Sequence, residues 1–223
     1  HARMGDTDQP TGFWLEELAV PYYAFRDAGF AITVASPRGG MAPLDPLSLA
    51  EEHQSETPRR FRADVAALRD ITETQRLVRM SAEDHDLLFY PGGHGPMWDL
   101  AVDPATAALA SAFFAAGKPV GAVCHGPAAR VAATRPDGRP LVAGETVTCF
   151  SNREEDSIGL TEVMPFLLED RLREQGATFV AAEPFEARVA GDGLVLTGQN
   201  PASSAELARR LIETTGMSRV AEA

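Results

Sequence analysis

The residues with the clearest capacity for chemistry lie in the stretch KPVGAVCHGP, residues 118–127. A small apolar run leads into Cys124, and His125 follows at once. In a nucleophile elbow the reactive residue stands between a strand and a helix, and the residues two before and two after it must be small. Here those positions hold Ala122 and Gly126. The spacing therefore favours a thiol nucleophile over a cysteine that only fills the core.

A thiol at such a turn points at the N-terminus of the next helix. The unpaired N–H groups and the dipole of that helix end favour the thiolate. We therefore expect the pKa of Cys124 to lie well below that of a free thiol. The other cysteine, Cys149, closes a strand-like run without an elbow, so we expect an inert core residue there.

A second glycine-rich turn could supply the oxyanion site that carbonyl chemistry needs beside a thiolate. The run PGGHG at 91–95 follows a buried strand candidate, LLFY, at the edge where ligands of open α/β sheets bind. The N–H groups of Gly92 and Gly93, with that of His125, could stabilise an oxyanion. His94 either contacts substrate or supports the turn, and the sequence leaves both possibilities open.

An acid/base partner for the thiol is expected early in the first helix, where Glu16 and Glu17 both qualify. The apolar face of that helix does not decide between them, and both would also suit an exposed helix N-terminus. The histidines His53, His85 and His94 are scattered without metal-ligand spacing. The sequence therefore predicts neither a metal site nor a cofactor.

Length and composition predict one sizeable α/β domain, since 223 residues suffice for a single core and are few for two. The formal net charge of −12 argues against a nucleic-acid partner, for which a basic face is expected. No apolar run approaches the roughly 20 residues that span a bilayer, so no membrane partner is expected. Two cysteines without a visible signal peptide are typical of a reduced, cytoplasmic protein.

Alternating strand and helix signals predict a doubly wound, mainly parallel sheet with helices on both faces. Strands are expected at 30–35, 87–90, 120–123, 146–150, 179–181, 187–190 and 194–197. Helices are expected at 12–28, 62–68, 73–78, 105–116, 126–133, 160–175 and 202–214. Residues 41–82, which contain several prolines and many charges, are expected to form a loop or small cap, and the sequence leaves open whether this segment closes over the site or builds an interface.

The chain opens on a loop and a helix, whereas a doubly wound domain normally opens on a strand in the middle of its sheet. Without that strand, two neighbouring strands would lie unpaired beside a gap in the core. We therefore expect that the first strand is missing and that several apolar residues precede His1 in the native gene product.

Four motifs follow one another along the chain: TGFWLEEL at 11–18, YPGGHGPMWDL at 90–100, AVCHGPA at 122–128 and TGQNPAS at 197–203. Together and in this order they closely resemble the ThiJ/PfpI superfamily. Within it, the chain is similar to the heat-shock chaperone and glutathione-independent glyoxalase branch, described as type 1 glutamine amidotransferase-like. The resemblance covers nearly the whole chain. It implies a flavodoxin-like, class I glutamine amidotransferase-like fold, a single domain over 1–223 and a homodimer.

The resemblance also implies a role for each matching residue. Cys124 matches the nucleophile, His125 the histidine that follows it, and Glu17 the acidic residue of the first helix. Upstream of TGFWLEEL, members of the superfamily carry the strand that this chain lacks.

The acid that orients the histidine falls in the run SNREED. Glu155 is the best match there, and Glu154 and Asp156 remain alternatives.

The implied activity is conversion of methylglyoxal, or a related small 2-oxoaldehyde, to a 2-hydroxy acid such as lactate, as in a D-lactate dehydratase-type lyase. Cys124 would form a hemithioacetal, Glu17 would move the carbon-bound proton, and His125 would serve the hydroxyl protons. A histidine adjacent to the cysteine argues against ammonia channelling. Two alternatives stay open: a stress-response holdase or redox sensor, and, more weakly, a cysteine peptidase or amidase.

Overall fold

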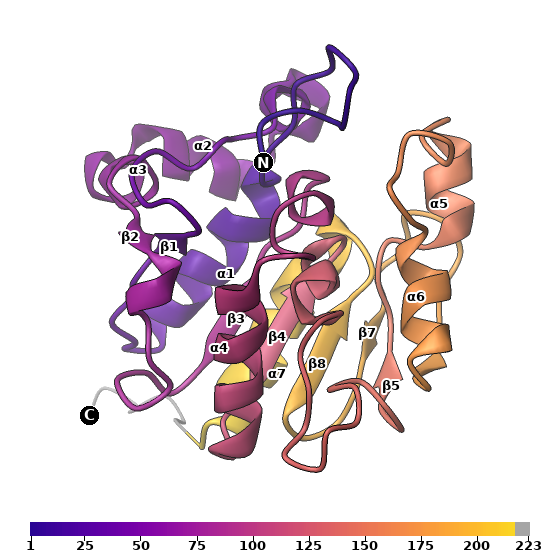
Figure 1. Ribbon diagram of the computed structural model, residues 1–223. Helices are drawn as coiled ribbons and strands as arrows, with labels where there is room; N and C mark the ends of the chain where they lie inside the picture. The colour runs from indigo at the N-terminus through magenta and orange to yellow at the C-terminus, as the bar shows by residue number, and fades with distance from the viewer. Residues whose placement is uncertain (217–223) are drawn as a thin grey trace.

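The computed structural model describes residues 1–216 and contains a four-stranded sheet with helices on both faces (Figure 1). The strands stand in the order β3-β4-β8-β7, with bounds Leu88–Tyr90, Val120–Val123, Val195–Gly198 and Val189–Ala190. β3, β4 and β8 are parallel to one another, and β7 is antiparallel to β8. The predicted α/β class with a mainly parallel sheet is confirmed.

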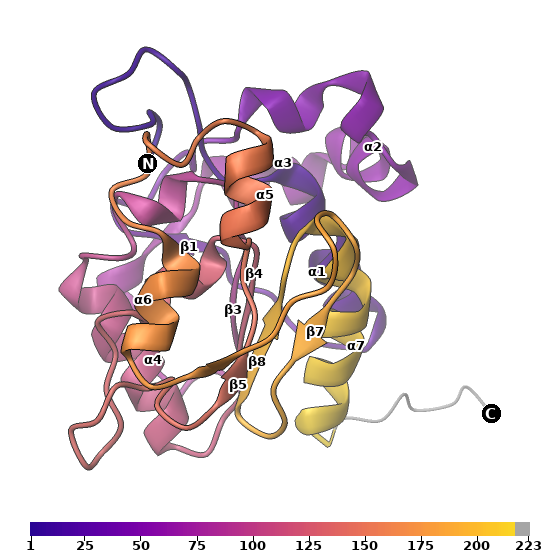
Figure 2. The same cartoon turned by 90° about the vertical axis from the view of Figure 1, so that its right-hand side faces the viewer.

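The two central strands, β4 and β8, are buried along their whole length, as strands between two helical layers must be. The helices α1 (Leu15–Asp27) and α7 (Ser204–Thr214) lie side by side on one face, and α4 (Pro104–Ala115) covers the other (Figure 2). Within residues 1–216 no helix combines the length and the apolar character needed to cross a membrane.

Two short parallel pairs flank the main sheet. β1 (Ala35–Ser36) pairs with β2 (Gln75–Arg76), and β5 (Thr146–Val147) pairs with β6 (Thr178–Phe179). The second pair accompanies α5 (Asn152–Ser157) and α6 (Leu168–Glu174), which stand at the right-hand side of Figure 1.

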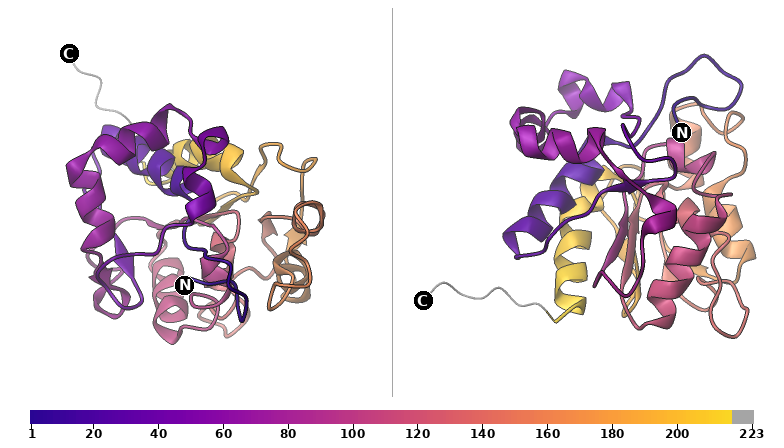
Figure 3. Two further views of the ribbon diagram at one scale, coloured as in Figure 1. Left: turned by 90° about the horizontal axis from the view of Figure 1, so that it is seen from above. Right: turned by 60° about the vertical axis from the view of Figure 1, so that its left-hand side comes forward.

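Residues 41–82 form η1 (Pro46–Leu49), η2 (Glu51–His53), α2 (Glu56–Ala63), α3 (Val65–Thr72), β2 and η3 (Leu77–Arg79). Of these, η1 and α2 pack on α1 (Figure 3), whereas η3 packs on α4, and Leu77 and Ala82 belong to the core cluster of the main sheet. Phe61 is fully buried, and its ring lies 5.3 Å from that of Tyr22 and 6.2 Å from that of Tyr23. The cap expected at residues 41–82 stays a prediction.

Several elements differ from those expected. The helix predicted at 73–78 is wrong, because this segment forms β2, which pairs with β1, and then η3. Of the strand predicted at 30–35, only residue 35 belongs to a strand, β1. The helix expected after the elbow is the short 3-10 turn η5 (Gly126–Arg130), and α5 was not expected at all.

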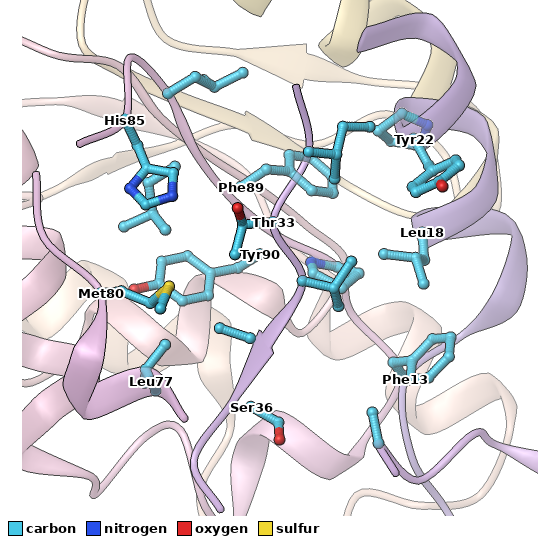
Figure 4. Close-up of a pocket in the computed structure, with 18 of the residues that line it drawn as sticks. Phe13, Leu18, Tyr22, Thr33, Ser36, Leu77, Met80, His85, Phe89 and Tyr90 are labelled. Carbon is cyan, nitrogen blue, oxygen red and sulfur yellow. The ribbon is translucent and has the colours of Figure 1, made fainter. Parts of the chain in front are cut away.

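A cavity of about 420 Å³ lies between β3 and residues 30–36. Figure 4 shows Leu18 and Tyr22 of α1 among its lining residues, with Phe89 and Tyr90 of β3. Among the described residues, β3 pairs with β4 alone, and residues 30–34 belong to no strand. The additional strand expected from the sequence stays a prediction.

Candidate active site

Cys124 stands at the turn between β4 and η5. Its φ of 59° is a left-handed conformation that non-glycine residues seldom adopt. A Cβ at Gly126 would come within 2.3 Å of the Tyr90 carbonyl oxygen, so only glycine lets the chain double back there. The Cys124 N–H donates to the Gly198 carbonyl at 2.9 Å, and the Phe150 N–H donates to the Cys124 carbonyl at 3.0 Å. This geometry is that of a nucleophile elbow.

His125 and Glu155 continue from the thiol as a hydrogen-bonded chain. The Cys124 sulfur lies 3.4 Å from Nδ1 of His125, and Nε2 of the same ring lies 2.7 Å from Oε2 of Glu155. His125 and Glu155 are both buried. Nucleophile, base and orienting acid stand in this order in the catalytic triads of hydrolases.

The three acidic residues of SNREED lie on α5 in different environments. Glu154 closes a capping box with Ser151, whose N–H donates to the Glu154 carboxylate at 2.8 Å, and it also accepts from the Asn200 amide at 2.8 Å. Asp156 is exposed. Glu154 therefore fixes the start of α5, and the next residue, Glu155, contacts His125.

Glu17 reaches the thiol from the first turn of α1 and is fully buried. The Cys124 thiol and the amides of Gly92 and Gly93 face its carboxyl group. Neither Oε1 nor Oε2 of Glu17 meets both the distance and the angle of a hydrogen bond to a described residue. Glu16, in contrast, accepts a hydrogen bond from a serine hydroxyl at 3.0 Å at the surface. The fold therefore brings Glu17, and not Glu16, to the candidate nucleophile.

Burial dominates the electrostatics of the site. It raises the pKa of Glu17 from 4.5 to about 8, and the nearby Cys124 thiol only partly opposes it. Burial, and next the Glu17 carboxylate, also raise the pKa of Cys124. The expected low thiol pKa is therefore wrong, because that expectation considered the helix end but not the loss of solvent. Burial lowers the pKa of His125, His94 adds to this effect, and Glu155 opposes it.

The turn at 91–95 lies against the elbow. The Gly93 N–H faces the Cys124 sulfur and favours its anionic form. The Gly92 N–H faces the Glu17 carboxyl group instead, and the Gly92 carbonyl accepts from the Trp14 N–H at 3.1 Å. Of the two glycines expected to bind an oxyanion, only Gly93 thus directs its N–H toward the Cys124 sulfur. That assignment stays a prediction.

The same site contains a group of residues that could hold a metal ion. The ligand atoms of His94, His125 and Glu155 all lie within 4.8 Å of one another. Sequence spacing did not indicate this group, because 61 residues separate His94 from Glu155. In the structure these atoms hydrogen-bond to one another, which satisfies them as a polar network.

Two aromatic residues that the sequence analysis missed border the site. The ring of Phe150 lies 4.9 Å from that of His125 and 6.1 Å from that of His94. The ring of Phe185 lies 6.2 Å from that of Phe150, is 52% exposed, and sits at a left-handed φ of 65°. The one available signal was the position of Phe150 directly before SNREED.

A family model described as DJ-1/PfpI family matches residues 10–214. The glutathione-independent glyoxalase HSP31 of Saccharomyces cerevisiae is 30% identical over 212 residues, covering 91% of this chain and 89% of the relative. The structure of Rapid Encystment Protein 24 kDa of Francisella tularensis has a TM-score of 0.91 at 34% identity, covering 96% of this chain and 95% of that one. Glyoxalase III of Candida albicans has a TM-score of 0.86 at 27% identity, covering 92% and 89%. The chain thus belongs to the DJ-1/PfpI family, as its four motifs predicted.

Proposed function

We propose that the protein is a glutathione-independent glyoxalase, which converts a small 2-oxoaldehyde and water to a 2-hydroxy acid. One observation carries the proposal: the fully buried carboxyl group of Glu17 faces the Cys124 thiol. Its pKa of about 8 suits a group that both accepts and returns a proton near neutral pH. The names of the yeast relative and of the Candida structure support the same activity.

The first step is attack of the Cys124 sulfur on the aldehyde carbon. The thiol proton passes to Nδ1 of His125, which lies 3.4 Å away, and the sulfur forms the new bond to carbon. The carbonyl oxygen becomes an alkoxide and takes the proton back from the imidazolium. Glu155 stabilises the imidazolium while it exists, since its carboxylate accepts from the other ring nitrogen at 2.7 Å.

The second step moves hydrogen between the two carbons of the hemithioacetal. The carboxylate form of Glu17 removes the proton from the carbon bonded to sulfur. Nδ1 of neutral His125 takes the hydroxyl proton of the hemithioacetal and passes it to the ketone oxygen. The resulting enediolate then accepts the Glu17 proton at the neighbouring carbon, which leaves His125 neutral again. A thioester of the 2-hydroxy acid remains on Cys124.

The last step is hydrolysis of this thioester. Water attacks the carbonyl carbon, the carbon–sulfur bond breaks, and the sulfur recovers a proton as the 2-hydroxy acid leaves. The Gly93 N–H, which faces the sulfur, is a donor for the negative charge that develops.

Burial of the thiol favours a small substrate. Cys124 is 6% exposed, so its sulfur cannot meet an extended peptide without rearrangement of the site. This argues against the peptidase alternative. No specific observation on residues 1–216 favours a holdase or a redox sensor over the glyoxalase.

The test is incubation of purified protein with methylglyoxal and glyoxal, without glutathione, with detection of lactate or glycolate. Wild type should form the acid. Cys124→Ala should form none, and Glu17→Gln should fall to background because no group can carry the carbon-bound proton. Cys149→Ala is the matched control, since Cys149 is buried in the core cluster and should not affect turnover. Full turnover by Glu17→Gln would contradict the mechanism.

A further inference from the structure

Glu155 joins two histidines, and only one of them has a role in the proposed reaction. Its Oε2 lies 2.7 Å from Nε2 of His125, and its Oε1 lies 3.0 Å from Nε2 of His94. The Glu155 side chain is 4% exposed and the His94 side chain 12%. Each oxygen of one buried carboxylate is therefore engaged by a different imidazole.

His94 is held firmly for this contact. Its ring centroid lies 4.2 Å from that of His125 and 6.1 Å from that of Phe150. Its carbonyl accepts the N–H of Met97 at 3.0 Å, which closes a 3-10 turn. A ring that packs on two other rings and hydrogen-bonds to a carboxylate has little freedom to move toward a bound substrate.

The contacts of Glu155 decide where the imidazole protons lie. Burial would raise its pKa, but the contacts with His125 and then His94 outweigh burial and lower it to about 2. An ionised carboxylate only accepts hydrogen bonds, so each Nε2 carries its proton. In neutral His125 the lone pair is then on Nδ1, the atom 3.4 Å from the Cys124 sulfur.

We propose that His94 is a positioning residue that holds Glu155 through its second oxygen and so keeps His125 in the tautomer that can take the thiol proton. Without the His94 contact, the Glu155 carboxylate can turn about its last bond and lose the alignment of Oε2 with the ring of His125. A ring with the proton on Nδ1 cannot accept from the thiol.

The charges around His125 come from several elements. Glu155 and Glu154 face it from α5, His94 faces it from the turn after β3, and Cys124 precedes it in the chain. Replacement of His94 by a neutral residue removes the one group among these that disfavours the imidazolium. The pH dependence of Cys124 alkylation should therefore shift when His94 is replaced. Loss of a merely structural residue would not cause such a shift.

The kinetic test rests on the proposed function and compares His94→Phe with His94→Gln. Phe keeps a ring without a donor, whereas the Gln amide can reach and donate to Oε1. With methylglyoxal, His94→Phe should lower kcat about 10- to 100-fold at unchanged KM, the usual effect of a lost hydrogen bond to an ionised group. His94→Gln should recover much of this loss. His85→Phe, at the far end of β3, is the control and should leave both constants unchanged.

Two measurements test the proposal even if methylglyoxal is not a substrate. Nitrogen-15 NMR of histidine-labelled wild type should show Nε2 protonated in both His94 and His125. The pH profile of Cys124 alkylation by iodoacetamide should shift in His94→Phe and less in His94→Gln. An Nδ1-protonated His125 in wild type, or a His94→Phe variant that changes KM alone, would overturn the proposal. Absence of turnover by wild type with these signatures intact would refute the glyoxalase proposal only.

Discussion

Environment, and not residue type, separates the two buried glutamates of the site. Glu17 has no close hydrogen-bond partner among the described residues, and burial raises its pKa to about 8. Glu155 bonds two imidazoles, which lower its pKa to about 2 despite burial. When the environment shifts the pKa values of two like groups in opposite directions, the two groups are suited to different acid/base roles. Glu17 is suited to move a proton, and Glu155 to remain an anion that orients His125.

The raised pKa of Glu17 makes folding stability depend on pH. Between pH 4.5 and about 8 the folded protein holds a proton on Glu17 that the unfolded chain releases. This contribution to stability is complete below pH 4.5 and is lost as pH rises through 8, with a size of up to about 5 kcal/mol. Glu17→Gln carries no such proton, so its stability relative to wild type should increase from pH 5 to pH 8.5.

Urea unfolding of both proteins at the two pH values measures this difference. Glu16→Gln, at the half-exposed neighbouring position, is the control and should parallel wild type. Parallel profiles for Glu17→Gln and wild type would show that the Glu17 carboxyl group is not buried in its neutral form.

At the level of elements, two local devices carry the site. The elbow places Cys124 at a left-handed φ between β4 and η5, and the capping box of α5 lets Glu155 face inward. Both devices come from short runs of sequence. The elbow was predictable from Ala122 and Gly126, because small residues two before and two after Cys124 form a local sequence pattern. The capping box was not predicted, because the acidic run SNREED by itself does not show which of its carboxylates caps a helix.

Gly126→Ala tests the elbow. Its Cβ would meet the Tyr90 carbonyl oxygen at 2.3 Å, and backbone atoms cannot move aside without separating β3 from the turn. We expect a loss of stability of roughly 3 kcal/mol or more, from steric overlap in a packed core. Alkylation of Cys124 should also speed up as the elbow opens.

Gly138→Ala is the matched control for Gly126→Ala. Gly138 has a φ of 82° but open space around it, so only the backbone term of about 1 kcal/mol applies. Equal losses in urea unfolding for the two variants would show that close approach of the backbone does not shape the elbow.

At the scale of the molecule, the parallel sheet brings the turn at 91–95 and the elbow to one edge, because β3 and β4 run in the same direction side by side. The same sheet leaves one side of β3 unpaired among residues 1–216, beside the 420 Å³ cavity. A homodimer stays a prediction.

The cavity should accept an added strand. His1 is among the lining residues, so a segment fused ahead of it can enter the space between β3 and residues 30–36. A β-branched apolar pentapeptide fused there should stabilise the protein by about 2 kcal/mol or more, since buried apolar side chains outweigh the ordering of the segment. The expected rise in Tm is roughly 4–8 °C. A Gly/Ser segment of equal length is the control, and equal Tm values would contradict the expectation.

The sequence by itself determined the parallel α/β fold and the position of the elbow that carries Cys124. Periodicity and small residues at fixed spacing act over a few residues, so they can be recognised without the partner segments. The strand at 120–123 was predicted with its observed bounds for this reason. Short strands were predicted too long, because the pairing that ends them depends on distant segments.

Only the tertiary structure decided which acids serve the site and with what charge. Glu17 rather than Glu16 faces the thiol, and Glu155 rather than Glu154 hydrogen-bonds to His125. The contact of His94 with Glu155 joins residues 61 apart, and the high thiol pKa follows from solvent exclusion by the whole fold. Burial and long-range contacts set these properties, and a linear pattern of residues does not contain them.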